Sequence, residues 1–459
     1  MLARLFLIAC CLCVVSPGHA DDPLRVMASL SSPTGRPLPG QVVQSPCAQR
    51  LPDTPLTAVE AVDLALCNHP RTREVWANAR SQAALVGVGE AAWWPRVDAR
   101  ASETRIFNRG EAYDQRTLGL NASWLLFDAG ARAANLEAAQ RLLDAAQASR
   151  DSTLQALFFT ALQTYYVAQA AQAAVRAAEL TERAAQEAAQ AAALRYQVGV
   201  TTPADRLQAT TAYSQSVLNR VRANGTLRTA LGALANALGF DAYAPITLAQ
   251  EDELRPDLAW KADVEALVSE ARRRRPDLVA AEAQWLAARA SVGAVSAAGK
   301  PTLSVTATPT WQQSAGVHSD GGALGLTLNV PLFYGFETHY RTRAAEAVAE
   351  ARQAQREQLS SQIALDVWRS YQSLQTALQA LLATQDLLTS AEASEQMALG
   401  RYKAGVGQIL DLLNAQAALA GARAQRIQAV FDWRLARAAL AQAMGSLDYR
   451  LLENGEGTR

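Results

Sequence analysis

The sequence predicts a mainly α-helical protein that is built from two copies of one helix–strand–strand–long helix–helix unit. Half of the 459 residues are hydrophobic, yet the mean hydropathy is only −0.05, because 96 residues are alanine. The same anchor residues recur 206 positions apart, and the stretches 131–198 and 337–399 contain neither glycine nor proline. Alanine favours helices and has little apolar area to bury, so this composition is typical of long, closely packed helices.

The first 20 residues are predicted to be an export signal. Arg4 provides the positive start, residues 5–15 are apolar, and small residues precede Asp21. A lipoprotein cleavage site at Cys10 would leave only nine residues upstream, so a lipid anchor is the weaker alternative. We expect the exported chain to begin with a Pro-rich segment, residues 21–55.

Cys47 and Cys67 are the cysteines that remain after the signal. In an exported, oxidising compartment such a pair indicates a candidate disulfide, which would tie the Pro-rich segment to the first helix. Two buried free thiols are the alternative.

One offset of 206 residues aligns the two halves of the chain. It predicts a first repeat at 56–245, a linker at 246–261, a second repeat at 262–450 and a tail at 451–459. The aligned residues are His69-Pro70 with Arg275-Pro276, Leu118-Gly119-Leu120 with Leu324-Gly325-Leu326, Phe127 with Phe333, Arg195-Tyr196 with Arg401-Tyr402, Asp205 with Asp411, and Gly239 with Gly445.

Each copy begins with a helix that ends at Pro95 or Pro301, and two strands follow. Apolar and polar residues alternate with the period of a strand that has one apolar and one polar face. The predicted strands are 96–106 and 117–127 in the first copy, and 301–310 and 323–332 in the second. The stretches between them, 108–116 and 312–322, are polar and contain glycine, which is typical of loops.

A long helix follows the second strand of each copy, and Gly199 or Gly405 ends it. At 1.5 Å per residue the first of these helices would reach about 100 Å. The helix that returns after Gly199 carries Leu227, Leu231, Leu234 and Leu238, a spacing that favours a coiled-coil-like seam.

Four strands of about ten residues are long enough to cross an outer membrane at a tilt. Lipid leaves backbone donors and acceptors unsatisfied, so a spanning sheet must close into a β-barrel, and the smallest such barrels have eight strands. The chain supplies four, which predicts an oligomer. Aromatic residues at the strand ends fit an interfacial belt: Trp93, Trp124, Trp311 and Phe333. A soluble sheet packed on helices is the alternative.

With these features the sequence resembles the TolC-like outer-membrane efflux and secretion factors. The resemblance rests on the duplicated unit, on the strand exit Pro331-Leu332-Phe333, and on the two Arg-Tyr-x-x-Gly turns. It implies a homotrimer with a 12-stranded barrel in the bacterial cell outer membrane and a long helical tunnel in the periplasm. It also implies docking to a periplasmic adaptor and an inner-membrane ABC or proton-driven exporter, with the turns at Gly199 and Gly405 at the periplasmic tip.

The resemblance further points to residues at the tunnel entrance. The family narrows this entrance with acidic side chains one helical turn apart, and the matching positions are Asp411 and Asn414. Asp205 matches the acid of an acid–arginine link, but the arginine position is Gly407, and Arg206 or Arg401 is the alternative partner. Three Asp411 carboxylates around an axis would attract cations. Both aspartates also suit the N-terminus of a helix, where a carboxylate stabilises the helix dipole.

Other classes of protein have less support. With 43 basic and 43 acidic residues the chain lacks the charge of a nucleic-acid binder. His69, His318 and His339 are widely spaced, and no metal-ligand pattern or nucleophile elbow is present, so we expect no catalytic residue, no metal and no cofactor.

The sequence therefore favours the exit duct of a type I secretion system that exports a protein, toxin-like substrate. The outer-membrane component of a multidrug efflux pump is the alternative, and a periplasmic coiled-coil adaptor without a barrel is a more remote one. The sequence identifies neither the cargo nor the cognate exporter.

Overall fold

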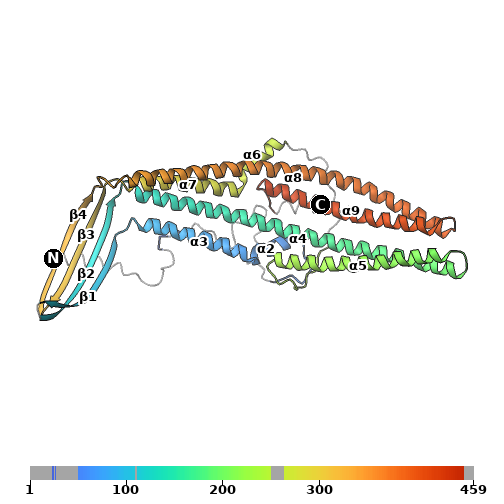
Figure 1. Cartoon of the computed structure of the whole chain (residues 1–459), viewed down its shortest axis with the longest axis horizontal. Helices are drawn as coiled ribbons and strands as arrows, with labels where there is room; N and C mark the ends of the chain where they lie inside the picture. The colour runs from blue at the N-terminus through green and yellow to red at the C-terminus, as the bar shows by residue number, and fades with distance from the viewer. Residues whose placement is uncertain (1–22, 25, 27–49, 109–110, 250–262, 449–459) are drawn as a thin grey trace. The chain divides into compact units, whose positions relative to one another are not determined.

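The computed structural model describes residues 23–24, 26, 50–108, 111–249 and 263–448 (Figure 1). The predicted signal 1–20, most of the Pro-rich segment with Cys47, most of the linker 246–261 and the tail 451–459 lie outside the described residues. None of the helices in the described ranges combines the length and hydropathy that a membrane-spanning helix needs.

The second half of the chain repeats the elements of the first half in the same order. The first copy contains α2 (Ala58–Asn68), α3 (Pro70–Ala91), β1 (Arg96–Asn108), β2 (Glu111–Phe127), α4 (Ala131–Gln197) and α5 (Pro203–Ala237). The second copy contains α6 (Val264–Arg274), α7 (Pro276–Ala297), β3 (Thr302–Ser314), β4 (Val317–Asn329), α8 (Glu337–Lys403) and α9 (Ile409–Ala443). Each element of the second copy begins 206 residues after its counterpart, so the mainly helical, duplicated fold predicted from the sequence is confirmed.

The helix expected at the start of each copy is interrupted and forms two helices. His69 and Arg275 have extended backbones, with ψ of 130° and 120°, and each precedes a proline. The proline ring disfavours helical geometry in the residue before it, which explains why α2 and α6 end there. Pro70 and Pro276 then begin α3 and α7.

The four strands form one antiparallel sheet in the order β1-β2-β3-β4. The strands are longer than the alternation predicts, because residues expected in loops pair across the two hairpins. The β3–β4 turn consists only of Ala315 and Gly316, whose φ angles are 49° and 85°. Two consecutive residues with positive φ suit a tight hairpin turn, since their twist matches that of the strands.

One face of the sheet carries a band of apolar side chains. Directly paired residues share a face, and the register pairs Trp124 with Val305 and Val305 with Leu326. Leu324 and Leu326 are 78% and 66% exposed, so the chain does not cover this band itself. We define the apolar band as Leu118, Leu120, Ala122, Trp124, Leu303, Val305, Ala307, Trp311, Leu324, Leu326 and Leu328.

The helices pack in two compact units, which are considered separately. One unit contains the sheet and the helical residues up to Arg150 and Leu359. Its core cluster is small and joins Ala83 and Val86 of α3 to Leu143 of α4. Alanine side chains in such a seam let the helix backbones approach closely.

The other unit contains the larger core. Phe158, Leu162 and Tyr165 of α4 pack against Leu234 and Leu238 at the end of α5. The Tyr165 hydroxyl, fully buried, donates a hydrogen bond of 3.1 Å to the carbonyl oxygen of Leu56. The predicted leucine seam thus contributes directly to this core, with Leu227 and Leu231 partly buried beside it.

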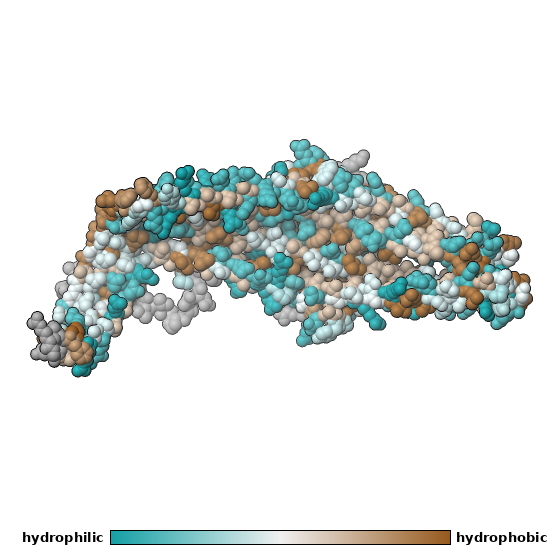
Figure 2. Space-filling model, viewed as in Figure 1, coloured by the Kyte–Doolittle hydropathy of each residue, from teal (hydrophilic) through white to brown (hydrophobic). Residues whose placement is uncertain are grey.

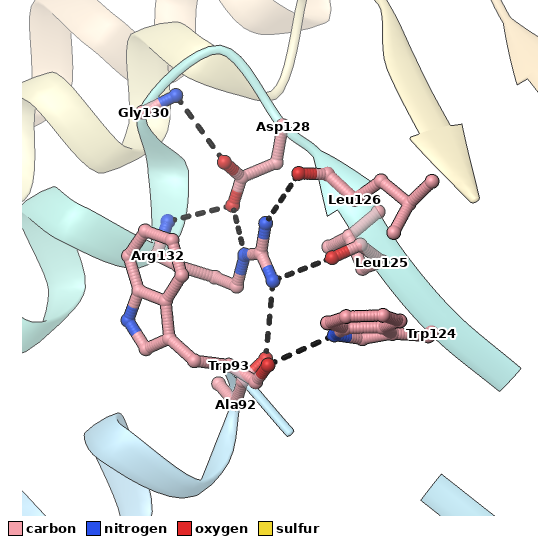
Figure 3. A network of polar contacts seen from close by, with 8 residues as sticks. All are labelled: Ala92, Trp93, Trp124, Leu125, Leu126, Asp128, Gly130 and Arg132. Atoms are coloured by element: carbon pink, nitrogen blue, oxygen red, sulfur yellow. Dashed lines mark hydrogen bonds and ion pairs between the residues drawn. The ribbon is translucent and has the colours of Figure 1, made fainter. Parts of the chain in front are cut away.

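A buried polar network joins β2 to α4 (Figure 3). The Asp128 carboxylate accepts hydrogen bonds from the backbone N–H and the Nε of Arg132, at 2.8 and 3.0 Å. The Arg132 guanidinium also donates to the carbonyl oxygens of Leu125 and Leu126, at 2.6 and 3.3 Å, and lies 4.4 Å from the ring centre of Trp93. The charge pair therefore satisfies backbone groups that the end of the strand leaves unpaired.

Candidate functional site

The two long helical hairpins end in turns with the same backbone structure. Gly199 and Gly405 have φ angles of 74° and 79°, the left-handed conformation that glycine adopts without steric cost. The N–H of the following valine donates to the carbonyl oxygen of Arg195 at 3.0 Å in the first turn and of Arg401 at 3.1 Å in the second. These bonds close the last helical turn, so the paired Arg-Tyr-x-x-Gly sequences form matching C-terminal caps.

The first turn fixes its carboxylate in a capping box. Asp205 accepts a hydrogen bond from the backbone N–H of Thr202 at 3.1 Å, and its own N–H donates to the Thr202 hydroxyl at 3.2 Å. The hydroxyl of Thr201 donates to the same carboxylate. The hydrogen bonds from Thr201 and Thr202 hold the pKa of Asp205 below its ordinary value, because they stabilise the charged form. Asp205 therefore caps α5.

The second turn has lost these partners. Gly407 and Gln408 stand where the first copy has the two threonines, and Gln408 makes no side-chain cap. Asp411 lies in the first turn of α9 and is exposed, with no hydrogen bond or ion pair to any described residue. Asn414 is exposed on the same side of the helix, whereas Leu412 is buried. Asp411 is consequently available to an external cation in a way that Asp205 is not.

Gly407 has a steric reason to lack a side chain. A Cβ atom at this position would lie 3.0 Å from the backbone nitrogen of Tyr402 and 3.1 Å from the carbonyl carbon of Arg401. The Gly407 N–H donates to the Arg401 carbonyl oxygen at 3.1 Å, which holds the turn in this tight form. A side chain at position 407 would therefore require this backbone to shift by a few tenths of an ångström.

The arginines near the turns contact aromatic rings and carbonyl oxygens instead of Asp205. Arg195 stacks 4.4 Å from the ring centre of Tyr402 and donates to the Tyr402 carbonyl oxygen at 2.7 Å, which links α4 to α8. Arg206 stacks on Tyr196 at 4.6 Å. Within the described residues of a single chain, neither Arg206 nor Arg401 forms an ion pair with Asp205, and a substitute for the missing link stays a prediction.

The ends of both hairpins pack into one small core. Ala188 and Ala192 of α4 and Ala209 of α5 contact Ile409 and Leu412 of α9. Tyr402 belongs to the same cluster; it is 5% exposed, and its hydroxyl has no hydrogen-bond partner in the described part of the chain. A cleft of about 230 Å³ lies beside this tyrosine. Sequence reasoning missed both features, since neither leaves a local pattern.

The predicted belt residues lie at two levels of the sheet. The Trp124 indole N–H donates to the Trp93 carbonyl oxygen at 2.9 Å, so these two residues share one level. Trp311 lies six residues beyond Val305, the partner of Trp124, or about 20 Å along the strand. Trp93, Trp124 and Trp311 are 40–44% exposed, and Phe333, just past β4, is 72% exposed. They stand at the two ends of the apolar band, although their role as a belt stays a prediction.

Cys67 forms a disulfide bond. The predicted partner, Cys47, lies outside the described residues. The pairing of Cys47 with Cys67 remains a prediction, which titration of free thiols in the unreduced, denatured protein tests.

The described residues show no group of three or more His, Cys, Asp or Glu side chains that would suit a metal. His69 lies at the break between α2 and α3, where its Nδ1 accepts a hydrogen bond of 3.2 Å from the Arg71 N–H. Burial, and secondarily the charge of Arg71, lower the pKa of this imidazole. His69 thus has a structural role at the helix boundary.

Paired strands of alternating polarity that continue into long helical hairpins with matching turns define the class of outer-membrane channel proteins. A family model described as "Outer membrane efflux protein" matches residues 61–240 and again 267–446. The chain belongs to this family. It is an outer-membrane channel protein and not an enzyme, and the TolC-like resemblance found in the sequence is confirmed.

Curated relatives and solved structures agree with this assignment. The chain is 32% identical to Protein CyaE of Bordetella pertussis over 88% of this chain and 86% of that protein. It is 21% identical to the outer membrane protein TolC of Vibrio cholerae over 77% of this chain and 80% of that one. The crystal structure of the CmeC outer membrane channel of Campylobacter jejuni matches with a TM-score of 0.77, 18% identity, and coverage of 86% and 88%.

Proposed function

We propose that three copies of this chain form the exit duct of a type I secretion system. In this proposal each copy contributes four strands to a 12-stranded barrel, and the helical hairpins continue as a tunnel into the periplasm. A periplasmic adaptor and an inner-membrane ABC exporter deliver a protein substrate to the tunnel. The energy comes from the exporter, because the channel family is not enzymatic.

The uncovered apolar band is the observation that carries this proposal. A sheet with an exposed apolar face and two edge strands, β1 and β4, is unstable alone in water and in lipid. Closure with further copies pairs the edges, and lipid covers the band. Family membership supports the same arrangement.

The entrance of the tunnel is proposed to lie at the two hairpin turns. Three uncapped Asp411 carboxylates then surround the axis, while Asn414 contributes no charge. The three capped Asp205 side chains stay fixed within α5. Such a ring favours cations over anions at the mouth.

The choice of protein secretion over drug efflux rests on the identity to the relatives. Identity to CyaE is 32%, whereas the efflux relatives BepC of Brucella suis and TtgC of Pseudomonas putida are 25% and 28% identical over smaller shares of this chain. The efflux-pump component remains the second candidate, because the family description and several relatives carry that function in their names.

Deletion of the gene in its own host distinguishes the two candidates. We expect a protein to disappear from the culture medium while drug susceptibility stays unchanged. Increased drug susceptibility with an unchanged set of secreted proteins would favour the efflux pump.

Labelling of intact cells tests the membrane topology. A cysteine at Ser314, next to the β3–β4 turn, should react with a membrane-impermeant maleimide, whereas one at Gln353 of α8 should react only after the outer membrane is opened. Equal labelling of both positions in intact cells would contradict the proposed topology, in which the β3–β4 turn faces the outside and α8 lies in the periplasm.

A further inference from the structure

The face of the sheet that carries the apolar band becomes polar toward the hairpin turns. Side chains alternate between the two faces along a strand, so Gln313 shares a face with Trp311, and Arg116 shares it with Leu118. Figure 2 shows strongly hydrophobic side chains where the sheet meets α8 and hydrophilic ones toward the hairpin turns. We define the polar row as the paired residues that cross the sheet at this level: Glu103, Arg116, Gln313 and His318.

The polar row lies beyond the length of strand that lipid can cover. Leu303 and Trp311, at the two ends of the band on β3, are about 26 Å apart along the strand. At the usual tilt this gives about 20 Å of height, most of the apolar height of about 25 Å in outer-membrane barrels. In the proposed orientation the row therefore lies among the headgroups of the leaflet that faces away from the helices.

An open cleft of about 600 Å³ lies where the apolar band meets the polar row. Its lining includes Leu118 and Trp311 of the band, the whole polar row, and Asp320. Asp320 is the direct cross-strand partner of Trp311, so the carboxylate lies beside the indole on the same face of the sheet. Trp311 is 40% exposed. The cleft thus combines an accessible aromatic ring with polar groups of several kinds.

An ion pair positions the arginine of the cleft. The Nε of Arg116 donates a hydrogen bond of 2.9 Å to the Glu103 carboxylate. The terminal N–H groups of Arg116 make no hydrogen bond to any described residue, although a guanidinium has five N–H donors in a fixed arrangement. Arg116 is therefore oriented by Glu103 and still has donors for a ligand.

The composition of the cleft suits a sugar better than a simple anion. The Gln313 amide both donates and accepts hydrogen bonds, the Asp320 carboxylate accepts them, and Arg116 donates them, which together match the hydroxyl groups of a sugar. The indole of Trp311 offers an apolar surface to the C–H groups of a sugar ring. A free phosphate or carboxylate would be repelled by the carboxylates of Glu103 and Asp320.

We propose that this cleft binds the sugar headgroup of a glycolipid in the outer leaflet of the outer membrane. Trp311 stacks on a sugar ring, while Arg116, Gln313 and Asp320 bind its hydroxyl groups. The inference rests on the proposed function, because it requires the band to lie in lipid. Leu118 belongs to both the band and the cleft, so acyl chains that cover the band place their own headgroup at the cleft.

Native mass spectrometry of the full-length protein in detergent tests the proposal. The protein is titrated with purified lipid A, an acylated disaccharide, or with phosphatidylglycerol, whose headgroup has a phosphate but no sugar ring. We expect saturable binding of lipid A that is at least about tenfold tighter than binding of phosphatidylglycerol, because several hydrogen bonds to the sugar are added. The disaccharide without its acyl chains should bind more weakly than lipid A, since it loses contact with the band.

Matched variants locate the binding. Trp311→Leu keeps an apolar side chain but removes the ring, and should weaken binding of lipid A at least about fivefold, whereas Trp311→Phe should retain most of it. Arg116→Gln should weaken binding about tenfold, since a charged donor is lost. The control is Arg100→Gln, an exposed arginine of β1 on the opposite face of the sheet, which should bind lipid A as the parent does.

The outcomes separate this inference from the proposed function. Absence of the chain from the outer-membrane fraction of cells would overturn the proposed function and this inference with it. If the chain is present there, equal binding of lipid A and phosphatidylglycerol would overturn the sugar site alone. Equal binding of the deacylated disaccharide and lipid A would overturn the glycolipid as the ligand. Unchanged binding of lipid A to Arg116→Gln and Trp311→Leu would overturn the cleft as its site.

Discussion

Asp205 and Asp411 occupy equivalent positions in the two copies but have different surroundings. Asp205 accepts hydrogen bonds from Thr201 and Thr202 and donates one to the Thr202 hydroxyl, while the Asp411 side chain has no hydrogen bond to any described residue. The difference follows from two substitutions in the second turn, Gly407 and Gln408 in place of Thr201 and Thr202. One aspartate has thus kept a structural role, and the other is available for an electrostatic one.

Replacing Asp411 with Ala should weaken block of single-channel current by multivalent cations at least about tenfold, because each removed carboxylate contributes about 1 kcal/mol or more to cation binding. Current recordings in planar bilayers measure this block. Asp205→Ala is the matched control and should leave the block unchanged. An unaltered block in the Asp411 variant rules out the acidic ring.

Asp205→Asn should lower the stability of the folded protein at neutral pH. The pKa of Asp205 is lower in the folded than in the unfolded chain, so its contribution is present above the unfolded pKa and is lost as the pH falls through the folded pKa. Urea unfolding at pH 7 and pH 3 measures the difference from the parent protein. We expect a difference at pH 7 that shrinks at pH 3, and a pH-independent difference would contradict the capping role.

Gly407→Ala should destabilise the second turn, since the new Cβ would meet the backbone of Arg401 and Tyr402. The control is Gly421→Ala in the middle of α9, where nothing lies within 4 Å of the added carbon. That variant should stabilise the protein by about 0.5–1 kcal/mol through helix propensity. Thermal unfolding compares the two, and stabilisation by both would mean that the turn is looser than the structure shows.

At the scale of the elements, the two strand-to-helix junctions differ in what stabilises them. Each turns through two residues of positive φ, yet one contains the buried Asp128–Arg132 pair and the other carries exposed aromatic side chains such as Phe333 and Phe336. The buried Arg132 guanidinium donates hydrogen bonds to three carbonyl oxygens in addition to the Asp128 carboxylate. This pair therefore fixes where β2 ends and α4 begins.

Arg132→Met should cost about 3 kcal/mol of unfolding free energy, because it leaves the Asp128 carboxylate buried without its cation. Arg341→Met removes an exposed pair with Glu337 in the first turns of α8 and should cost less than about 0.5 kcal/mol. Urea unfolding in detergent measures both. Similar losses for the two variants would show that burial of the first pair is unimportant.

Much of the element order follows from the sequence, because the periods of 3.6 and 2 and the glycine turns are local signals. The outer parts of the two β-hairpins are not predicted by the sequence. Residues 108–116 and 312–322 lack the alternation that marks a strand, yet their cross-strand pairing extends β2, β3 and β4. The sequence does not predict the Arg132 network, because Ala92, whose carbonyl oxygen accepts a hydrogen bond from Arg132, lies 40 positions away. The spacing of Asp128 and Arg132, at i and i+4, is a local signal of the ion pair alone.

The sequence predicts the candidate site only in part. The family resemblance identifies Asp411, Asn414 and Asp205, but it does not indicate the surroundings of each side chain. The structure shows that Thr201 and Thr202 hold Asp205 in the first turn. The second turn has Gly407 and Gln408 at these positions, so the absence of the same cap there can be read from the sequence. The stacking of Arg195 on Tyr402 joins residues more than 200 positions apart and leaves no local pattern.

At the scale of the whole molecule, the proposed function requires lipid to cover the apolar band. Leu324→Arg places a charge on the lipid face and should cost about 2–4 kcal/mol near mid-membrane. Ala323→Arg places the same charge on the opposite, polar face and should be tolerated. Recovery of folded protein in the outer-membrane fraction measures both, and equal recovery would contradict the assignment of the faces.

The short β3–β4 hairpin has a consequence for recognition from outside the cell. In the proposed orientation only three residues of β3 follow Trp311 before the two-residue turn at Ala315 and Gly316. An antibody or a phage fibre needs roughly 800 Å² of surface for firm attachment, more than one such tip provides. Positive φ at both turn residues also limits which side chains can replace them. In the proposed orientation, a binder from outside the cell would therefore have to contact neighbouring strands or copies as well as this turn.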